Sequence, residues 1–278
     1  MLKQRVMTAA LLIPIVIGLL IYLSQWAFCI VSGVIFLMAA MEWMTLIPLK
    51  TTVGRVIYLI LFINVMGVLL VAPIPPEIKM GVILSVSVLW WLLASFMILF
   101  YPHRAAWWRN KIFLKCLMGM LVLIPCWLSL IFIRAQPEGL VMLFYVLFLI
   151  WGADTTAYFV GKRWGKTKLA PGVSPGKTME GVAGALVFTI IFSAVAAYVS
   201  SHPPVIVLVA AIGLSLLTVI FSIVGDLFES MIKREAGVKD SGNLLPGHGG
   251  LLDRIDSLTA ALPIYAFTSM VLSLIFTA

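Results

Sequence analysis

Long apolar runs, each separated from the next by a short polar segment, set the pattern of this sequence. A helix needs about 20 apolar residues to cross the hydrocarbon core of a bilayer. Nine runs come close to that length or exceed it, at residues 7–24, 26–47, 54–72, 80–100, 113–133, 140–160, 181–200, 204–228 and 257–276. The pattern therefore predicts an all-α, polytopic membrane protein of about nine transmembrane helices.

The composition supports this prediction. Hydrophobic residues make up 63% of the 278 residues, charged residues make up 11%, and the mean hydropathy is +1.14. Soluble domains are about half apolar and about a quarter charged, so the composition excludes a water-soluble fold. The three cysteines, Cys29, Cys116 and Cys126, lie in or beside apolar runs and form no CxxC pair. This spacing argues against a disulfide framework or a zinc site.

The basic residues indicate the orientation of the chain. If the N-terminus is cytoplasmic, all but two of the 19 lysines and arginines fall on the inner side, and the exceptions are Lys79 and Arg134. Cytoplasmic loops carry such an excess of positive charge. We therefore expect the N-terminus in the cytoplasm and the C-terminus outside, on the periplasmic side. The net charge of +8 is spread over short loops, so we expect no nucleic-acid partner.

Loop length divides the chain into two parts. The predicted outer loops are short turns, whereas the inner segments 161–180 and 229–256 are longer and rich in Gly, Lys and Asp. Elaborate loops on one side of a membrane protein indicate that its chemistry is on that side. We therefore divide the chain into an N-terminal transmembrane scaffold of about five helices, residues 1–135, and a C-terminal catalytic region, residues 136–278, with both loops.

Two aspartates interrupt apolar runs of the C-terminal region. Asp154 and Asp226 each lie toward the predicted inner end of a span, where an Asp at full membrane depth would cost roughly 2.5–3.5 kcal/mol. One interpretation is a polar site that uses both carboxylates. The alternative is that each is a helix-end acid that reaches water or pairs with Lys or Arg.

The second inner loop combines glycines with basic residues. Gly247, Gly249 and Gly250 let backbone N–H groups approach an anion closely. Positive charge comes from Lys233, Arg234, Lys239 and Arg254. A phosphate-rich ligand fits this chemistry. Among these glycines, His248 is open to three interpretations: a base, a hydrogen-bond donor to phosphate, or a turn residue.

Asp253 and Asp256 are three residues apart, at the predicted start of the last helix. At this spacing they share one helix face, and two neighbouring carboxylates repel each other unless a cation lies between them. Mg²⁺ prefers carboxylate oxygens and bridges to substrate phosphates. With Asp226 on the preceding helix, the pair predicts a Mg²⁺ site. The alternative is acidic capping of a helix N-terminus.

The first inner loop contains the string Ser174-Pro175-Gly176-Lys177-Thr178. It resembles the end of a P-loop, but the earlier glycine is missing and no strand is expected before it, so we reject that motif. A looser anion site, made by the hydroxyls, the lysine and the free N–H groups of the helix that follows, remains a hypothesis. A basic inner loop without a ligand is the alternative.

The residues of the second loop resemble the signature of the phosphatidate cytidylyltransferase family, also called CDP-diacylglycerol synthases. The family pattern has a Ser, a Lys-Arg pair, Lys-Asp, a Pro or Gly before His-Gly-Gly, then Asp-Arg and a final Asp. This sequence matches it with Ser230, Lys233-Arg234, Lys239-Asp240, Pro246, His248-Gly249-Gly250, Asp253-Arg254 and Asp256. The string at 174–178 and Asp154 also resemble the bacterial members.

The resemblance implies an enzyme of the bacterial inner membrane whose site faces the cytoplasm. Its reaction would join CTP and phosphatidate to give CDP-diacylglycerol and pyrophosphate, with Mg²⁺ and an optional second cation such as K⁺. The implied catalytic residues are Asp226, Lys233, Arg234, Lys239, Asp240, His248, Asp253, Arg254 and Asp256, with Asp226, Asp253 and Asp256 as metal ligands. The implied substrate-binding residues are Asp154, Ser174, Lys177, Thr178, Ser230, Gly249 and Gly250. The apolar N-terminal half leaves room for a homodimer interface.

Other functions remain open at this point. Broken helices and intramembrane acids also mark transporters, although the polar residues here gather toward one face of the membrane. A structural or assembly protein would have no use for two glycine-rich anion-binding loops. Within the enzymes, a CTP-using relative that acts on another lipid phosphate is the nearest alternative.

Overall fold

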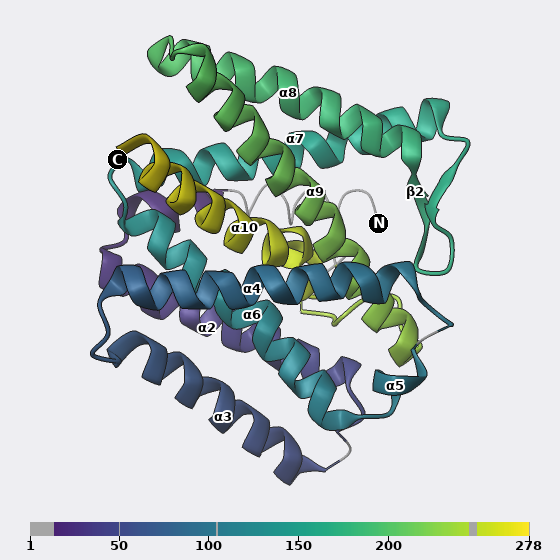
Figure 1. The fold of residues 1–278 in the computed structure, drawn as a ribbon. Coiled ribbons are helices and arrows are strands. Elements are labelled where there is room, and N and C mark those ends of the chain that lie inside the picture. Colours follow the sequence, from purple (N-terminus) through teal and green to yellow (C-terminus); the bar gives the residue numbers. More distant parts are fainter. Residues whose placement is uncertain (1–13, 50, 104, 245–248, 278) are drawn as a thin grey trace.

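The computed structural model describes residues 14–49, 51–103, 105–244 and 249–277, and it is almost entirely helical (Figure 1). Residues 14–22 are helical. The elements that follow are α2 (Gln25–Leu46), α3 (Thr52–Val71), α4 (Pro76–Leu99), α5 (Ala106–Arg109), α6 (Ile112–Ala135), α7 (Gly139–Trp164), β1 (Lys168–Ala170), β2 (Ser174–Thr178), α8 (Met179–Ser201), α9 (Val205–Ala236) and α10 (Leu252–Thr277). The all-α prediction is confirmed.

Eight helices of the described chain are long and apolar enough to cross a membrane: α2, α3, α4, α6, α7, α8, α9 and α10. They match the second to ninth predicted runs. Much of the first run, 7–24, lies outside the described residues, so the total of nine remains a prediction. The protein is a multi-pass membrane protein, and its helices satisfy their own backbone groups, as the hydrocarbon core requires.

Local sequence explains where several helices start. Ser24 and Thr51 cap α2 and α3 by accepting hydrogen bonds from the N–H groups of Ala27 and Gly54, and such side chains replace the missing intrahelical partners. At the start of α4, Pro76 needs no intrahelical partner because proline has no N–H group. These caps fall in the polar segments between the apolar runs.

The aromatic core joins the two halves of the chain. Phe228 of α9 stacks on Trp43 of α2, with 6.4 Å between ring centroids. The same ring meets the edges of Trp90 and Trp91 of α4 at 5.5 and 5.8 Å. α3 lies at one side of the bundle and exposes much of its apolar surface, whereas α7 and α8 lie at the other (Figure 1). The N-terminal half therefore supports the helix that carries Asp226.

Two boundaries differ from the sequence prediction. The run predicted to end at residue 228 continues as helix to Ala236, and Gly237 ends it with a φ of 72°. The last helix begins at Leu252 and not at 257, so Asp253 and Asp256 do lie in its first turns. Both ends of the predicted loop 229–256 are therefore helical. At the first end, Glu229 and Lys233 pair across one turn of α9 and are buried against other helices, which explains why the helix continues.

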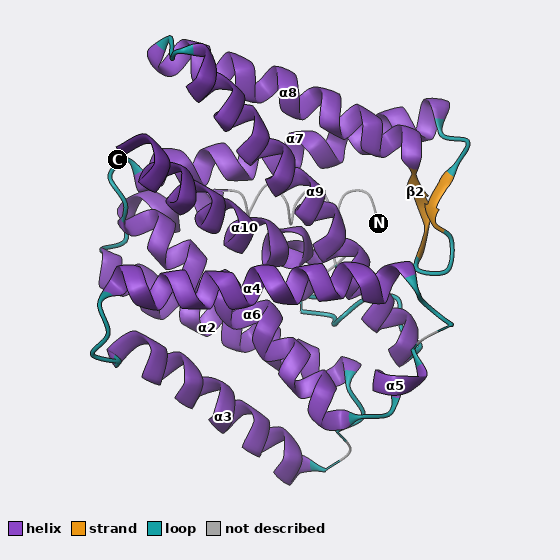
Figure 2. Cartoon of the chain, viewed as in Figure 1, coloured by secondary structure: helices purple, strands orange, loops and turns teal. Residues whose placement is uncertain are grey.

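The first polar loop also differs from expectation. It contains a two-stranded antiparallel hairpin, β1 and β2, in which Lys168 pairs with Thr178 and Ala170 with Ser174 (Figure 2). Val173 in the hairpin turn is buried, and its carbonyl accepts a hydrogen bond from Arg234 Nε at 3.2 Å. The hairpin is thereby attached to the end of α9.

Candidate functional site

Polar residues from three helices and one strand meet at the end of the bundle that carries the hairpin. α7 contributes Asp154, α9 contributes Asp226 and Glu229, and α10 contributes Asp253 and Asp256. Lys177 comes from β2, directly before α8. The structure therefore brings the two predicted inner loops to one place.

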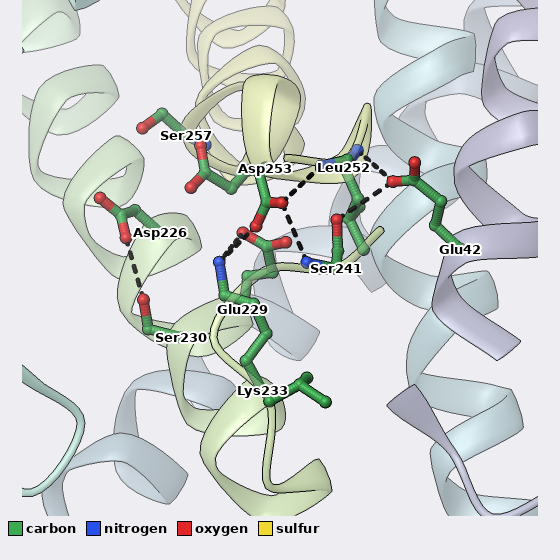
Figure 3. Close-up of polar contacts among 12 residues, drawn as sticks. Glu42, Asp226, Glu229, Ser230, Lys233, Ser241, Leu252, Asp253 and Ser257 are labelled. Carbon is green, nitrogen blue, oxygen red and sulfur yellow. Dashed lines mark hydrogen bonds and ion pairs between the residues drawn. The ribbon is translucent and has the colours of Figure 1, made fainter. Parts of the chain in front are cut away.

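Lys233 is the buried cation of this cluster. Its Nζ lies 2.6 Å from Asp253 Oδ1 and 3.3 Å from Glu229 Oε2, and all three side chains are less than 10% exposed (Figure 3). A buried charge is tolerated when it is paired and hydrogen-bonded. With two carboxylates on it, Lys233 holds α9 and α10 together at the site.

The second oxygen of Asp253 binds the loop that precedes α10. Asp253 Oδ2 accepts hydrogen bonds from the N–H groups of Ser241 and Gly250, at 2.9 and 2.8 Å. Gly249 adopts a φ of 82°, and a Cβ there would lie 2.7 Å from the same oxygen. Asp253 therefore lies in the first turn of α10 and binds the loop before that helix, and its role as a metal ligand remains a prediction.

Asp226 forms the second ion pair of the cluster. Its Oδ2 lies 2.7 Å from Lys177 Nζ, and Ser230 Oγ donates to its Oδ1 at 3.3 Å. Both charged side chains are about a quarter exposed. Asp154 is close enough to interact electrostatically with Lys177 and Asp226, and it lies beside Ser257. The predicted acids of the two apolar runs therefore lie near one lysine, which forms an ion pair with Asp226.

Glu229 is a site residue that the sequence analysis missed. It lies between Asp226 and Lys233 on α9, close enough to Asp256 for the two carboxylates to interact electrostatically. Its Oε1 is buried and has no hydrogen-bond partner. The spacing Asp226–Glu229–Lys233, three and then four residues along a helix, was the signal that these groups share a face. The sequence predicts a loop from residue 229 onward, and this prediction hides the shared helix face.

The cluster has a surplus of negative charge that fits a cation. Five carboxylates lie near only two lysines: Lys177 pairs with Asp226, Lys233 pairs with Glu229 and Asp253, and Asp154 and Asp256 form no ion pair among the described residues. Carboxylate oxygens are the ligands that Mg²⁺ prefers, and the unpartnered Glu229 Oε1 offers one. Within the described ranges, no three His, Cys, Asp or Glu side chains are already placed to hold a metal ion. A bound ion would therefore have to draw these carboxylates together.

The other predicted residues lie around this cluster in different settings. Thr178 is buried, and its Oγ1 accepts a hydrogen bond from Gly181 N at 3.2 Å as the cap of α8. Met179 N donates to Thr167 O, so two N–H groups of the proposed anion site have protein partners. Ser174 is half-buried. Exposed residues are Arg234, Lys239, Asp240 and Arg254, whereas His248 and Pro246 lie outside the described residues.

An ion pair between α5 and the last turn of α9 borders the site. Arg109 of α5 binds Glu235 with two hydrogen bonds, at 2.8 and 3.0 Å, and this contact raises the pKa of Arg109 above its ordinary value. Burial, followed by the contact with Glu235, raises the pKa of Tyr101. These residues fix the end of α9 against the segment that follows α4.

Comparison with known proteins identifies the family. The sequence model of the cytidylyltransferase family matches residues 3–272. The phosphatidate cytidylyltransferase of Pseudomonas aeruginosa is 42% identical over 266 residues, which are 96% of each chain. That of Haemophilus influenzae is 38% identical over 96% of this chain and 98% of its own, and that of Bacillus subtilis is 46% identical over 130 residues, about half of each chain. This chain therefore belongs to the cytidylyltransferase family.

Proposed function

We propose that this protein is a phosphatidate cytidylyltransferase, which transfers CMP from CTP to phosphatidate and releases pyrophosphate. The supporting observation is the cluster in which five carboxylates and two lysines meet at the end of a membrane helix bundle. Relatives that cover 96% of the chain carry that name. A soluble triphosphate and a membrane lipid can meet only where helices end at the membrane surface.

In the proposed reaction, a phosphate oxygen of phosphatidate attacks the α-phosphorus of CTP. A P–O bond forms there as the bond to the β-phosphate breaks, and pyrophosphate leaves with the electron pair. Enzymes catalyse phosphoryl transfer mostly by positioning the reacting groups and by stabilising the charge on the phosphates. The nucleophile is already anionic at neutral pH, so the reaction needs no strong base, and we assign His248 a positioning role.

The two lysines have different parts in this proposal. Lys233 is buried between Glu229 and Asp253, so it orients carboxylates and does not reach the substrate. Lys177 is about a quarter exposed, so its ammonium group can leave Asp226 and bind a phosphate oxygen. The exposed Arg234, Lys239 and Arg254 would attract the triphosphate.

Asp226, Asp253 and Asp256 would hold Mg²⁺, with Glu229 as an additional ligand. When bound, the ion would neutralise phosphate charge as a Lewis acid. A second cation such as K⁺ remains part of the proposal, because the five carboxylates carry more negative charge than the two lysines, Lys177 and Lys233, can balance. A homodimer and a location in the bacterial inner membrane are also part of the proposal. The expected orientation, with the site facing the cytoplasm, rests on the distribution of lysines and arginines.

The test is transfer of label from CTP to lipid. Purified protein in detergent receives phosphatidate, CTP labelled in its cytosine, and Mg²⁺, and the label in the organic phase is measured with and without EDTA. We expect transfer that EDTA stops and Mg²⁺ restores. Parallel reactions with other lipid phosphates identify the acceptor. Folded protein that transfers no label to any of them would overturn the proposal and favour transport or another phosphate ligand.

A further inference from the structure

A carboxylate from the N-terminal half lies beside the loop that leads into α10. Glu42 of α2 is buried, with 9% of its surface exposed. Its Oε1 accepts a hydrogen bond from Leu251 N at 2.9 Å, and its Oε2 accepts bonds from Leu252 N at 2.8 Å and Ser241 Oγ at 3.1 Å (Figure 3). Sequence analysis had assigned this half of the chain to a scaffold.

These contacts hold both ends of one loop. Ser241 lies shortly after α9 ends, and Leu251 directly precedes α10. Thr45, one turn after Glu42, adds a hydrogen bond to Ser241 O at 3.0 Å. The fit is close, because a Cβ on Gly250 would overlap both the Ser241 hydroxyl and the Glu42 carboxylate. A side chain of α2 thus contacts both ends of the loop that joins α9 to α10.

Among the described residues, Glu42 has no cation to balance its charge. No Lys, Arg or His of the described chain lies within 4 Å of its carboxylate oxygens. The N–H groups of Leu251 and Leu252 are instead the unpaired donors at the start of α10, where the helix dipole favours a negative charge. Glu42 is therefore a cap for α10 that comes from another helix, 210 residues away.

The contacts of Glu42 lead directly to the carboxylate cluster. Ser241 donates its hydroxyl to Glu42 and its N–H to Asp253. Asp253 then binds Lys233, which also binds Glu229. Glu42 and Asp253 together fix the first turn of α10, the turn that also leads to Asp256.

We propose that Glu42 is a positioning residue that sets α10 and the loop before it so that Asp253 and Asp256 face the reacting phosphates. The activity test of this inference rests on the proposed function. Residues that orient metal ligands typically contribute 10–100-fold to metal affinity or activity. Glu42 would therefore influence the use of the cation without touching a substrate.

The decisive variant is Glu42→Gln, which keeps the shape but replaces one acceptor oxygen with an NH₂ group facing a donor. We expect kcat to fall about tenfold or more and the Mg²⁺ concentration for half activation to rise, while KM for phosphatidate stays unchanged. Glu77→Gln, an exposed acid in the first turn of α4, is the matched control and should behave as wild type.

A second measurement does not depend on activity. Hydrogen–deuterium exchange of the peptide that contains Leu251 and Leu252 should be faster in Glu42→Gln than in wild type and in Glu77→Gln. Unchanged exchange, or an unchanged kcat and Mg²⁺ requirement, would overturn the inference. If wild type itself transfers no CMP, the proposed function fails, and the exchange result still decides whether Glu42 holds the loop.

Ser241→Ala provides a variant that spares the buried charge if Glu42→Gln does not fold. It removes one contact of Glu42 and keeps the N–H bond to Asp253. We expect a smaller loss of kcat than in Glu42→Gln, together with a raised Mg²⁺ requirement. A Ser241→Ala enzyme identical to wild type in both respects would contradict the inference.

Discussion

Lys177 Nζ lies 2.7 Å from Asp226 Oδ2, and this ion pair joins the first polar loop to the second. Two stretches of sequence that separately suggested phosphate and metal chemistry are thus parts of one site. Because both side chains are about a quarter exposed, an incoming phosphate can compete with Asp226 for the lysine.

Replacing Lys177 tests this relationship. Lys177→Ala leaves Asp226 and Asp154 without a nearby cation and removes a charged donor to phosphate. A charge-assisted hydrogen bond contributes about 1.5–3 kcal/mol, so we expect kcat/KM for CTP to fall roughly 10–100-fold. Initial rates against CTP concentration measure this, with the exposed Lys168→Ala as control. Equal losses in both variants would mean that only the general positive charge of the loop matters.

Asp256→Asn is expected to abolish turnover although the protein still inserts. Asp256 lies beside Glu229 and Asp226, and its neutral amide would be a poorer ligand for the cation that the cluster needs. We expect a loss of at least about a hundredfold, measured as label transferred at saturating Mg²⁺, with the exposed Glu138→Gln as control. Substantial residual activity would rule out Asp256 as a metal ligand.

Asp253→Asn should reduce stability as well as activity. The substitution leaves Lys233 buried with half of its carboxylate partners, and breaking a buried ion pair costs about 3 kcal/mol or more. Thermal unfolding in detergent should show a lower midpoint for Asp253→Asn, whereas the exposed Asp240→Asn should leave the midpoint unchanged. An unchanged midpoint for both would show that Lys233 does not need Asp253.

The orientation can be tested with cysteine labelling. In a variant whose three cysteines are replaced by alanine, Glu138→Cys should react with a membrane-impermeant maleimide added to intact cells. Lys166→Cys, in the segment before the hairpin, should react only after the membrane is made permeable. The reverse pattern would invert the predicted orientation and place the site outside.

Sequence predicted the helices well because apolar length is a local property. Eight predicted runs became membrane-length helices. The end of α9 was predicted too early because Glu229 and Lys233 look like loop residues until their partners are known. The hairpin was missed since Pro175 and Gly176 are unusual in strands, and they are tolerated here because a two-stranded sheet consists of edges.

The site was predicted in outline and not in its pairings. Asp226 and Asp256 interact electrostatically between α9 and α10, whereas Asp253 binds Lys233, and the shared metal ion remains a prediction. Which lysine binds which carboxylate depends on packing that no local pattern encodes. Glu42 illustrates this best, because its partners lie 199 to 210 residues further along the chain.

That separation has a consequence for how the protein is made. Glu42 leaves the ribosome 210 residues before Leu252, an interval of roughly 10–40 s at ~5–20 residues per second. For nearly all of that time the acid of α2 has none of its final hydrogen-bond donors, because the first of them, Ser241, lies 199 residues further along the chain. A chain whose synthesis stops before α10 keeps an unsatisfied carboxylate among its helices, which is costly in a membrane. The contact between α2 and the start of α10 can therefore form only when nearly the whole chain has been made.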